Sequence, residues 1–256
     1  MHMQAGIRQG LERGEFLLYY QPKVNLHDGR IVGAEALMRW RTAEGQIIPP
    51  GEFIPVAEDS GLIVPLGELA LRMACRQGMA WQRDGLPPLR ISVNLSAVQC
   101  KRQNIAETVS AILRETGLAP TSLELEITES LLMQNNRATL DALEWLRGLG
   151  VLVSVDDFGT GYSSLSYLKH LPVDILKIDR SFIDDIPGNA DDTAITKSVI
   201  SLGHHLNLRI IAEGVETAAQ ASFLLAHGCD EAQGYYFGKP LPPEAFQDLL
   251  AQGTLP

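Results

Sequence analysis

Polar side chains lie at or near the ends of seven successive apolar runs of the sequence. Three of them, Glu126, Asp156 and Glu213, are within or at the edge of dense apolar segments, where an unpaired carboxylate is costly to desolvate. Carboxylates crowded together would also repel one another, and some would have to take up protons. Divalent cations would remove that penalty, so the pattern predicts a metal site. The full set is Glu35, Arg39, Asn94, Glu126, Glu129, Asp156, Asp157, Lys177, Asp179, Glu213, Glu216 and Gln233.

The donor types indicate which ions such a site would hold. Oxygen donors from Glu, Asn and Asp, without Cys or His, suit Mg²⁺ or Mn²⁺ better than zinc. The adjacent Asp156 and Asp157 indicate two ions, because one carboxylate can bridge two metals about 4 Å apart while its neighbour completes the second site. Two such metals suit phosphodiester hydrolysis by a metal-activated water. Lys177, inside an apolar run, could orient or deprotonate that water, or offset charge in the transition state.

The elements that must position these side chains are eight short runs with strand character. Several are rich in Val, Ile and Leu on both faces, which is typical of parallel strands covered by helices. Helix-like segments at 104–116, 136–148, 191–205 and 217–227 alternate with the later runs. The alternation predicts a (β/α)8 barrel, whose chemistry sits at the carboxyl ends of the strands. The eight runs are residues 16–26, 31–39, 89–95, 123–128, 151–155, 175–178, 209–212 and 231–237.

The first two runs are an exception to the parallel pattern. Only the four residues His-Asp-Gly-Arg separate them, which is enough for a hairpin but not for a parallel crossover. We therefore expect a modified TIM barrel with one antiparallel strand from an N-terminal hairpin. The length of 256 residues matches the roughly 250 of one such barrel, and no linker divides the chain. We expect a single domain over residues 1–256, with residues 1–3 a possible cloning remnant.

Composition and charge restrict the partners and the location. The formal net charge of −10 argues against binding long nucleic acid through a basic face, although a small anionic ligand could bind through metal ions. Cys75, Cys100 and Cys229 are far apart and indicate buried thiols in a reducing compartment. The sequence shows neither a secretory signal nor a membrane-spanning run. We expect a cytoplasmic segment without membrane contact of its own. Regulatory domains outside this chain are also expected, and the parent protein could be attached to a membrane.

Short motifs follow one another along nearly the whole chain. They are Tyr20-Gln21-Pro22-Lys23, Asn94-Leu95-Ser96, Glu126-Ile127-Thr128-Glu129-Ser130, Asp156-Asp157-Phe158-Gly159-Thr160-Gly161-Tyr162, Leu176-Lys177-Ile178-Asp179-Arg180, Glu213-Gly214-Val215-Glu216 and Gln233-Gly234-Tyr235. Together with Glu35-Ala36-Leu37-Met38-Arg39, which has the form ExLxR, they resemble in order the blocks of EAL-domain cyclic di-GMP phosphodiesterases. The resemblance runs from about residue 21 to residue 240. It implies opening of the cyclic di-GMP ring to linear 5′-pGpG.

The resemblance also implies roles at the metal site. Four residues resemble metal ligands: Glu35, Asn94, Glu126 and Asp156. Asp156 would bridge two Mg²⁺ or Mn²⁺ ions, and Asp157 would serve the second ion. Lys177 and Glu213 resemble the groups that handle the nucleophilic water. Which group is the general base stays open.

Further positions resemble substrate-side and loop residues of the family. Four would face the substrate or the water: Gln21, Leu37, Arg39 and Gln233. Of these, Arg39 resembles the phosphate-contacting arginine. Glu129 resembles the residue that braces the loop 157–164, which in the family links the metal site to a dimer interface. The resemblance therefore implies a homodimer.

Two alternatives belong to other functional classes. The first is a receptor module that binds cyclic di-GMP without cutting it, which the complete set of catalytic-type residues opposes. The second is another metal-dependent barrel enzyme that acts on a different diester or on a carbon acid. The ordered motifs oppose that alternative.

Overall fold

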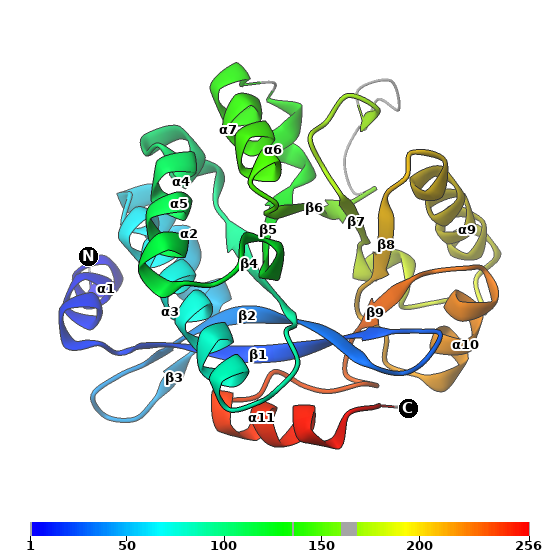
Figure 1. The fold of residues 1–256 in the computed structure, drawn as a ribbon, viewed down its shortest axis with the longest axis horizontal. Helices are drawn as coiled ribbons and strands as arrows, with labels where there is room; N and C mark the ends of the chain where they lie inside the picture. The colour runs from blue at the N-terminus through cyan, green and yellow to red at the C-terminus, as the bar shows by residue number, and fades with distance from the viewer. Residues whose placement is uncertain (1, 135, 160–167, 256) are drawn as a thin grey trace.

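Strands of the computed structural model, which describes residues 2–134, 136–159 and 168–255, form one closed sheet. Its order is β1-β9-β8-β7-β6-β5-β4-β2-β3, and β1 also pairs with β2, so eight strands form a ring to which β3 is added (Figure 1). The strands are β1 Phe16–Asn25, β2 Ile31–Arg41, β3 Ile47–Ile48, β4 Arg90–Leu95, β5 Leu123–Thr128, β6 Leu152–Phe158, β7 Ile175–Ile178, β8 Arg209–Ala212 and β9 Glu231–Gln233.

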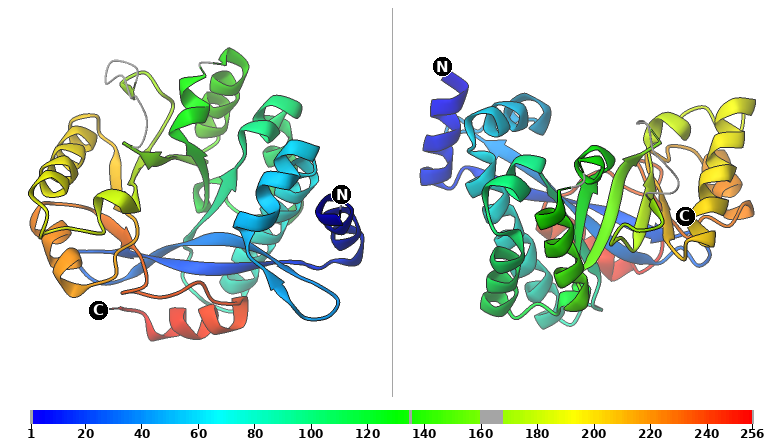
Figure 2. Two further views of the ribbon diagram at one scale, coloured as in Figure 1. Left: turned by 180° about the vertical axis from the view of Figure 1, so that it is seen from behind. Right: turned by 90° about the horizontal axis from the view of Figure 1, so that it is seen from above.

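The predicted hairpin is present, and it closes the ring. β1 pairs antiparallel with both β2 and β9, whereas each neighbouring pair from β2 through β4 to β9 is parallel. In both views of Figure 2 and in Figure 1, β1 and β2 lie side by side as one long ribbon. The fold is a modified TIM barrel, as the sequence predicts.

The last strand is shorter than the sequence predicts. Strand 231–237 was expected, but β9 ends at Gln233. From there the chain turns, because Gly234 packs against the backbone of Val215 and Gly238 N donates to Gly234 O. A Cβ at position 234 would lie 2.0 Å from Val215 O, so the turn requires glycine here.

Helices cover the outside of the ring, and side-chain caps define several of their starts. Asn104, Asn136 and Asn189 accept hydrogen bonds from backbone N–H groups of the first helical turn, and Thr217 forms a capping box with Gln220. All four predicted helical segments are present, as α5, α7, α9 and α10. The helices are α1 His2–Arg13, α2 Pro50–Ser60, α3 Ile63–Arg83, α4 Ala97–Arg102, α5 Ile105–Thr116, α6 Glu129–Met133, α7 Arg137–Gly148, α9 Ala190–His205, α10 Ala218–Ala226 and α11 Pro243–Gln252.

The apolar core lies between the ring and these helices, which leaves the inward positions of the strands for polar residues. In β5, Leu123, Leu125 and Ile127 belong to the core cluster, while the alternating Glu124 and Glu126 are buried on the other face. This period of two explains how a run that is buried throughout can direct carboxylates into the barrel.

Two expectations about cysteines and membranes can be compared with the structure. Cys75 and Cys229 are buried, but Cys100 is only partly buried, so the expectation of three buried thiols was wrong for Cys100. Cys100 lies on the short helix α4, at the rim of a surface groove. In the described part of the chain, no helix has the length and apolar character needed to cross a membrane.

Candidate active site

Three acidic side chains from different strands meet at the ammonium group of Lys177. Lys177 Nζ lies 2.6 Å from Glu126 Oε2, 3.1 Å from Asp156 Oδ1 and 2.6 Å from Glu213 Oε1. Glu126 is on β5, Asp156 on β6 and Lys177 on β7, while Glu213 directly follows β8. Lys177 and Glu126 are buried. Parallel neighbouring strands therefore bring these four predicted residues to one point at the barrel mouth.

A second group forms around Glu35 on β2. Asn94 Nδ2 donates to Glu35 Oε1 at 2.7 Å, and Gln233 Nε2 donates to Glu35 Oε2 at 2.6 Å. Gln233 Nε2 also lies 3.0 Å from Gln21 Oε1. Glu35 and Gln21 are Cα partners across the β1–β2 hairpin, so the antiparallel register puts both side chains on the inner face. Four more predicted residues thus form one hydrogen-bonded group.

The residues around Lys177 and those around Glu35 lie close enough to affect one another's pKa values. Burial and the nearby Glu126 raise the pKa of Glu35, and burial raises the pKa of Glu213 well above its ordinary value despite the opposing effect of Lys177. Burial would also raise the pKa of Glu126, but the ammonium groups of Lys177 and Lys23 hold it well below its ordinary value. Lys177 is the reverse case, because Glu126, Glu213 and Asp156 outweigh burial and raise its pKa. Lys177 is therefore an ammonium ion in a pocket with excess carboxylate.

The donor set fits hard divalent ions by its chemistry. Among the described residues, no group of three or more His, Cys, Asp or Glu is arranged as a metal site. The carboxylates instead accept hydrogen bonds from Lys177 and from the amides of Asn94 and Gln233. All the candidate donors are nevertheless oxygen atoms on adjacent strands, and burial together with neighbouring carboxylates raises the pKa of Glu35 and of Glu213. Cation binding would relieve that crowding.

Asp157 and Glu129 lie beside the first group. Asp157 has a φ of +56°, and its backbone N–H donates to Asp156 Oδ1 at 3.0 Å. Burial, with Asp156 and Asp179, raises the pKa of Asp157. Glu129 Oε2 accepts a hydrogen bond from Gly159 N at 3.0 Å, at the start of the loop that Glu129 was predicted to brace. Residues 160–164 of that loop lie outside the described residues, so the bracing role stays a prediction.

Arg39 and Leu37 lie at the rim of the mouth. The Arg39 guanidinium is half-buried above the Tyr19 ring, at 5.5 Å from its centroid, and donates to Met38 O. Leu37 lines a cavity of about 500 Å³ together with Asn94 and residues of α2 and α3. These two residues are thus near the carboxylates without a direct hydrogen bond to them among the contacts of the described residues.

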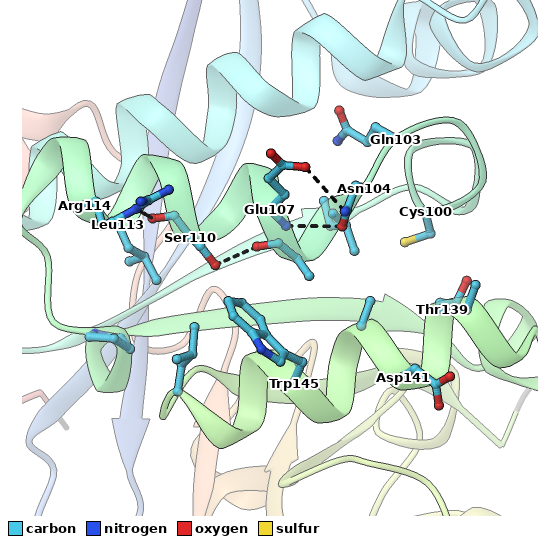
Figure 3. Close-up of a pocket in the computed structure, with 16 residues that line it drawn as sticks. Cys100, Gln103, Asn104, Glu107, Ser110, Leu113, Arg114, Thr139, Asp141 and Trp145 are labelled. Atoms are coloured by element: carbon cyan, nitrogen blue, oxygen red, sulfur yellow. Dashed lines mark hydrogen bonds between the residues drawn. The ribbon is translucent and has the colours of Figure 1, made fainter.

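A larger cavity lies away from the mouth. It has a volume of about 1040 Å³ and runs between α5 and α7, with Trp145 and Ser110 among its lining residues (Figure 3). None of the predicted site residues lines it. Cavity size alone would therefore point to the wrong part of this molecule.

Sequence reasoning missed two residues in the barrel interior. Lys23 Nζ lies 2.8 Å from Glu124 Oε1 and 2.7 Å from Glu126 Oε1, and all three side chains are buried. Their spacing along the strands could have revealed them, because Lys23 is two residues after Gln21 and Glu124 is two residues before Glu126. A period of two places each pair on the same face of its strand.

Comparisons with known proteins identify relatives over nearly the whole chain. The family model described as EAL domain matches residues 4–240. The chain is 48% identical over 238 residues to the bifunctional diguanylate cyclase/cyclic di-GMP phosphodiesterase MucR of Pseudomonas aeruginosa, covering 93% of this chain and 35% of MucR. It is 44% identical over 250 residues to the cyclic di-GMP phosphodiesterase NbdA of the same organism, covering 98% of this chain and 32% of NbdA.

A solved structure is similar in three dimensions as well. The P. aeruginosa MucR phosphodiesterase in complex with cyclic di-GMP superposes with a TM-score of 0.91 at 46% identity, covering 96% of this chain and all of that one. The chain spans about a third of the length of the curated relatives MucR and NbdA.

Proposed function

This chain belongs to the EAL domain family, and we propose that it is a metal-dependent phosphodiesterase that hydrolyses cyclic di-GMP to linear 5′-pGpG. The observation that carries the proposal is the meeting of Glu126, Asp156 and Glu213 at Lys177 Nζ, beside the pair formed by Glu35 and Asn94. Relatives that are 44–48% identical are cyclic di-GMP phosphodiesterases. The shared fold, with these acidic side chains at its mouth, supports the same chemistry here.

Four residues would hold two Mg²⁺ or Mn²⁺ ions: Glu35, Asn94, Glu126 and Asp156. Asp157, which directly follows Asp156, would add a further carboxylate to this set. When bound, such ions lower the pKa of a coordinated water and neutralise charge on phosphoryl oxygens.

Lys177 and Glu213 would serve the attacking water. Lys177 is an ammonium ion with raised pKa, so it cannot accept a proton and acts by orienting the acids and offsetting negative charge on the phosphorus centre. Burial raises the pKa of Glu213 well above its ordinary value, which makes its carboxylate a stronger proton acceptor than an exposed glutamate. Glu213 Oε1 is bound to Lys177, so Oε2 is the atom proposed to receive the proton of the water.

The remaining residues would hold the nucleotide. Arg39, half-buried at the rim, is proposed to contact a phosphate, because a guanidinium donates to phosphate oxygens with two parallel hydrogen bonds. Leu37 offers an apolar wall beside Asn94. Gln21 and Gln233 would contact the substrate side or the water side of the site. Glu129, through Gly159, would connect the site to the interface of a homodimer.

The decisive experiment is to incubate the purified chain with cyclic di-GMP and Mg²⁺ or Mn²⁺, and to follow pGpG by chromatography, with EDTA as the control. We expect pGpG only when metal is present. Nucleotide binding without pGpG would instead identify a receptor module. Faster hydrolysis of a simple diester than of cyclic di-GMP would identify a different barrel enzyme.

A further inference from the structure

Lys23 is a fully buried lysine that takes no part in the proposed steps. Its Nζ donates to Glu124 Oε1 at 2.8 Å and to Glu126 Oε1 at 2.7 Å. The other oxygen of Glu126, Oε2, accepts from Lys177 Nζ at 2.6 Å. The carboxylate of a proposed metal ligand is therefore held at both oxygens, by lysines from β1 and β7.

Two bonds at two oxygens fix the plane of a carboxylate. A glutamate side chain has several rotatable bonds, and a single bond at one oxygen would leave the carboxylate free to swivel about it. Each carboxylate oxygen has two acceptor positions, and the two lysines occupy one on each. Glu126 thus keeps acceptor capacity while its orientation is set.

The contact of Lys23 with Glu124 has a different consequence. Lys23 and Glu124 are both fully buried, and a buried charge is tolerated when it is paired. Pairing with Glu124 alone would neutralise Lys23. The additional bond to Glu126 is not needed for that neutralisation, although it extends the charge pair up to the proposed metal site.

We propose that Lys23 is a positioning residue that orients the Glu126 carboxylate for metal binding, with Glu124 as the counter-ion that keeps Lys23 charged and in place. The inference rests on the proposed function, because it treats Glu126 as a metal ligand. The competing explanation is that Lys23 only neutralises Glu124 and has no effect on the metal site.

The variant pair Lys23→Met and Glu124→Gln in one chain separates these explanations. It removes one positive and one negative charge, so the net charge of the barrel interior is unchanged, and Glu126 keeps Lys177. Three quantities are measured: the melting temperature, the Kd for Mn²⁺ without nucleotide by calorimetry, and kcat and KM for cyclic di-GMP. Lys101→Met, on the exposed face of α4, is the matched control.

We expect the double variant to melt closer to the wild type than Lys23→Met does, because it leaves no unpaired charge at position 124. Its Mn²⁺ affinity should fall by roughly 10–100-fold, as for other residues that orient a metal ligand. The loss in turnover should appear in kcat, with KM unchanged. Lys23→Met alone leaves Glu124 unpaired and should lower the melting temperature by on the order of 10 °C.

A double variant that keeps both the wild-type melting temperature and the wild-type Mn²⁺ affinity would overturn the proposal. If the double variant does not fold, Lys23→Met with Glu124→Leu replaces the pair by apolar residues, and the same criterion applies to it. A wild-type chain without Mn²⁺ affinity would overturn the proposed function, and this inference with it. Wild-type Mn²⁺ binding that the double variant retains would overturn this inference alone.

Discussion

Replacing Lys177 by methionine should destabilise the metal-free protein strongly. Met has a similar length but no charge, so Glu126, Asp156 and Glu213 would lose the ammonium that lies 2.6–3.1 Å from each of them. Removing one partner of a buried ion pair costs about 3–5 kcal/mol. For a chain of this size, each kcal/mol shifts Tm by roughly 2–4 °C, so the expected decrease is roughly 6–20 °C.

The same variant should respond more strongly to metal than the wild type. A ligand at a hundred times its Kd stabilises a protein by about 2.7 kcal/mol. The variant should gain more than the wild type does at the same Mn²⁺ concentration, because the cation would also relieve repulsion that Lys177 no longer offsets. Turnover should still fall, since Asp156 and Glu213 lose the ammonium that orients them.

The assay is thermal melting in EDTA and in Mn²⁺, with pGpG formation measured in parallel and Lys101→Met as the exposed lysine control. An Lys177→Met chain that melts with the wild type in EDTA would refute the reasoning, because it would mean that the folded chain accommodates the three acids without the Lys177 ammonium. Equal gains from Mn²⁺ in both chains would refute the link between the acids and the metal.

Three further predictions test other parts of the structure. Glu213→Ala should lower kcat by roughly 10²–10⁴-fold while the chain still binds Mn²⁺. Asp156→Asn should lower the affinity for Mn²⁺ by at least about 10-fold. Unchanged hydrolysis in either variant would show that the residue has no part in the proposed reaction. Burial raises the pKa of Glu35 and Glu213, so the folded metal-free chain holds protons that the unfolded chain releases above the ordinary glutamate pKa of 4.5. The Tm in EDTA should therefore decline as the pH rises from 4.5 through the raised pKa values, and saturating Mn²⁺ should abolish this decline. A Tm that increases with pH over this range in EDTA would contradict the raised pKa values. Thr217→Ala should lower the free energy of unfolding by about 1 kcal/mol, or Tm by roughly 2–4 °C, because it removes the N-cap hydroxyl of α10 that accepts a hydrogen bond from Gln220 N. Thr217→Ser keeps a hydroxyl at this position and should keep the wild-type Tm. An equal Tm for the two variants would show that the cap does not stabilise the protein.

The sequence alone was enough to predict the closed ring of strands and the side chains that meet inside it. The short His-Asp-Gly-Arg connection excluded a parallel crossover, and the structure has the resulting hairpin. Acids at strand ends could be placed together because a barrel brings the carboxyl ends of its parallel strands to one mouth.

The missed features depend on which face of a strand a residue occupies, or on contacts distant in sequence. Lys23 is two residues after Gln21, but its role follows only from the ring closure that brings β1 within reach of Glu124 and Glu126. The end of β9 depends on the close approach of Gly234 to Val215, which no local pattern encodes. The partial exposure of Cys100 depends on the placement of α4 beside a surface groove.

The distribution of charge along the barrel axis explains why the chemistry should occur at one end. Near the start of the strands, Glu231 pairs with both Arg90 and Arg209, so the charge of this acid is compensated. In the middle, Lys23 and Glu124 offset each other.

At the mouth, Lys177 contacts Glu126, Asp156 and Glu213, and Glu35 lies near enough to raise the pKa of Lys177. Of these acids, Glu126 also pairs with Lys23. A cation would therefore be attracted to the mouth, where the acidic groups outnumber the ammonium groups that contact them. The lysines inside the barrel do not fill that deficit. By neutralising Glu124 and holding Glu126, they confine the excess acidic charge to the mouth, where the proposed metal ligands lie.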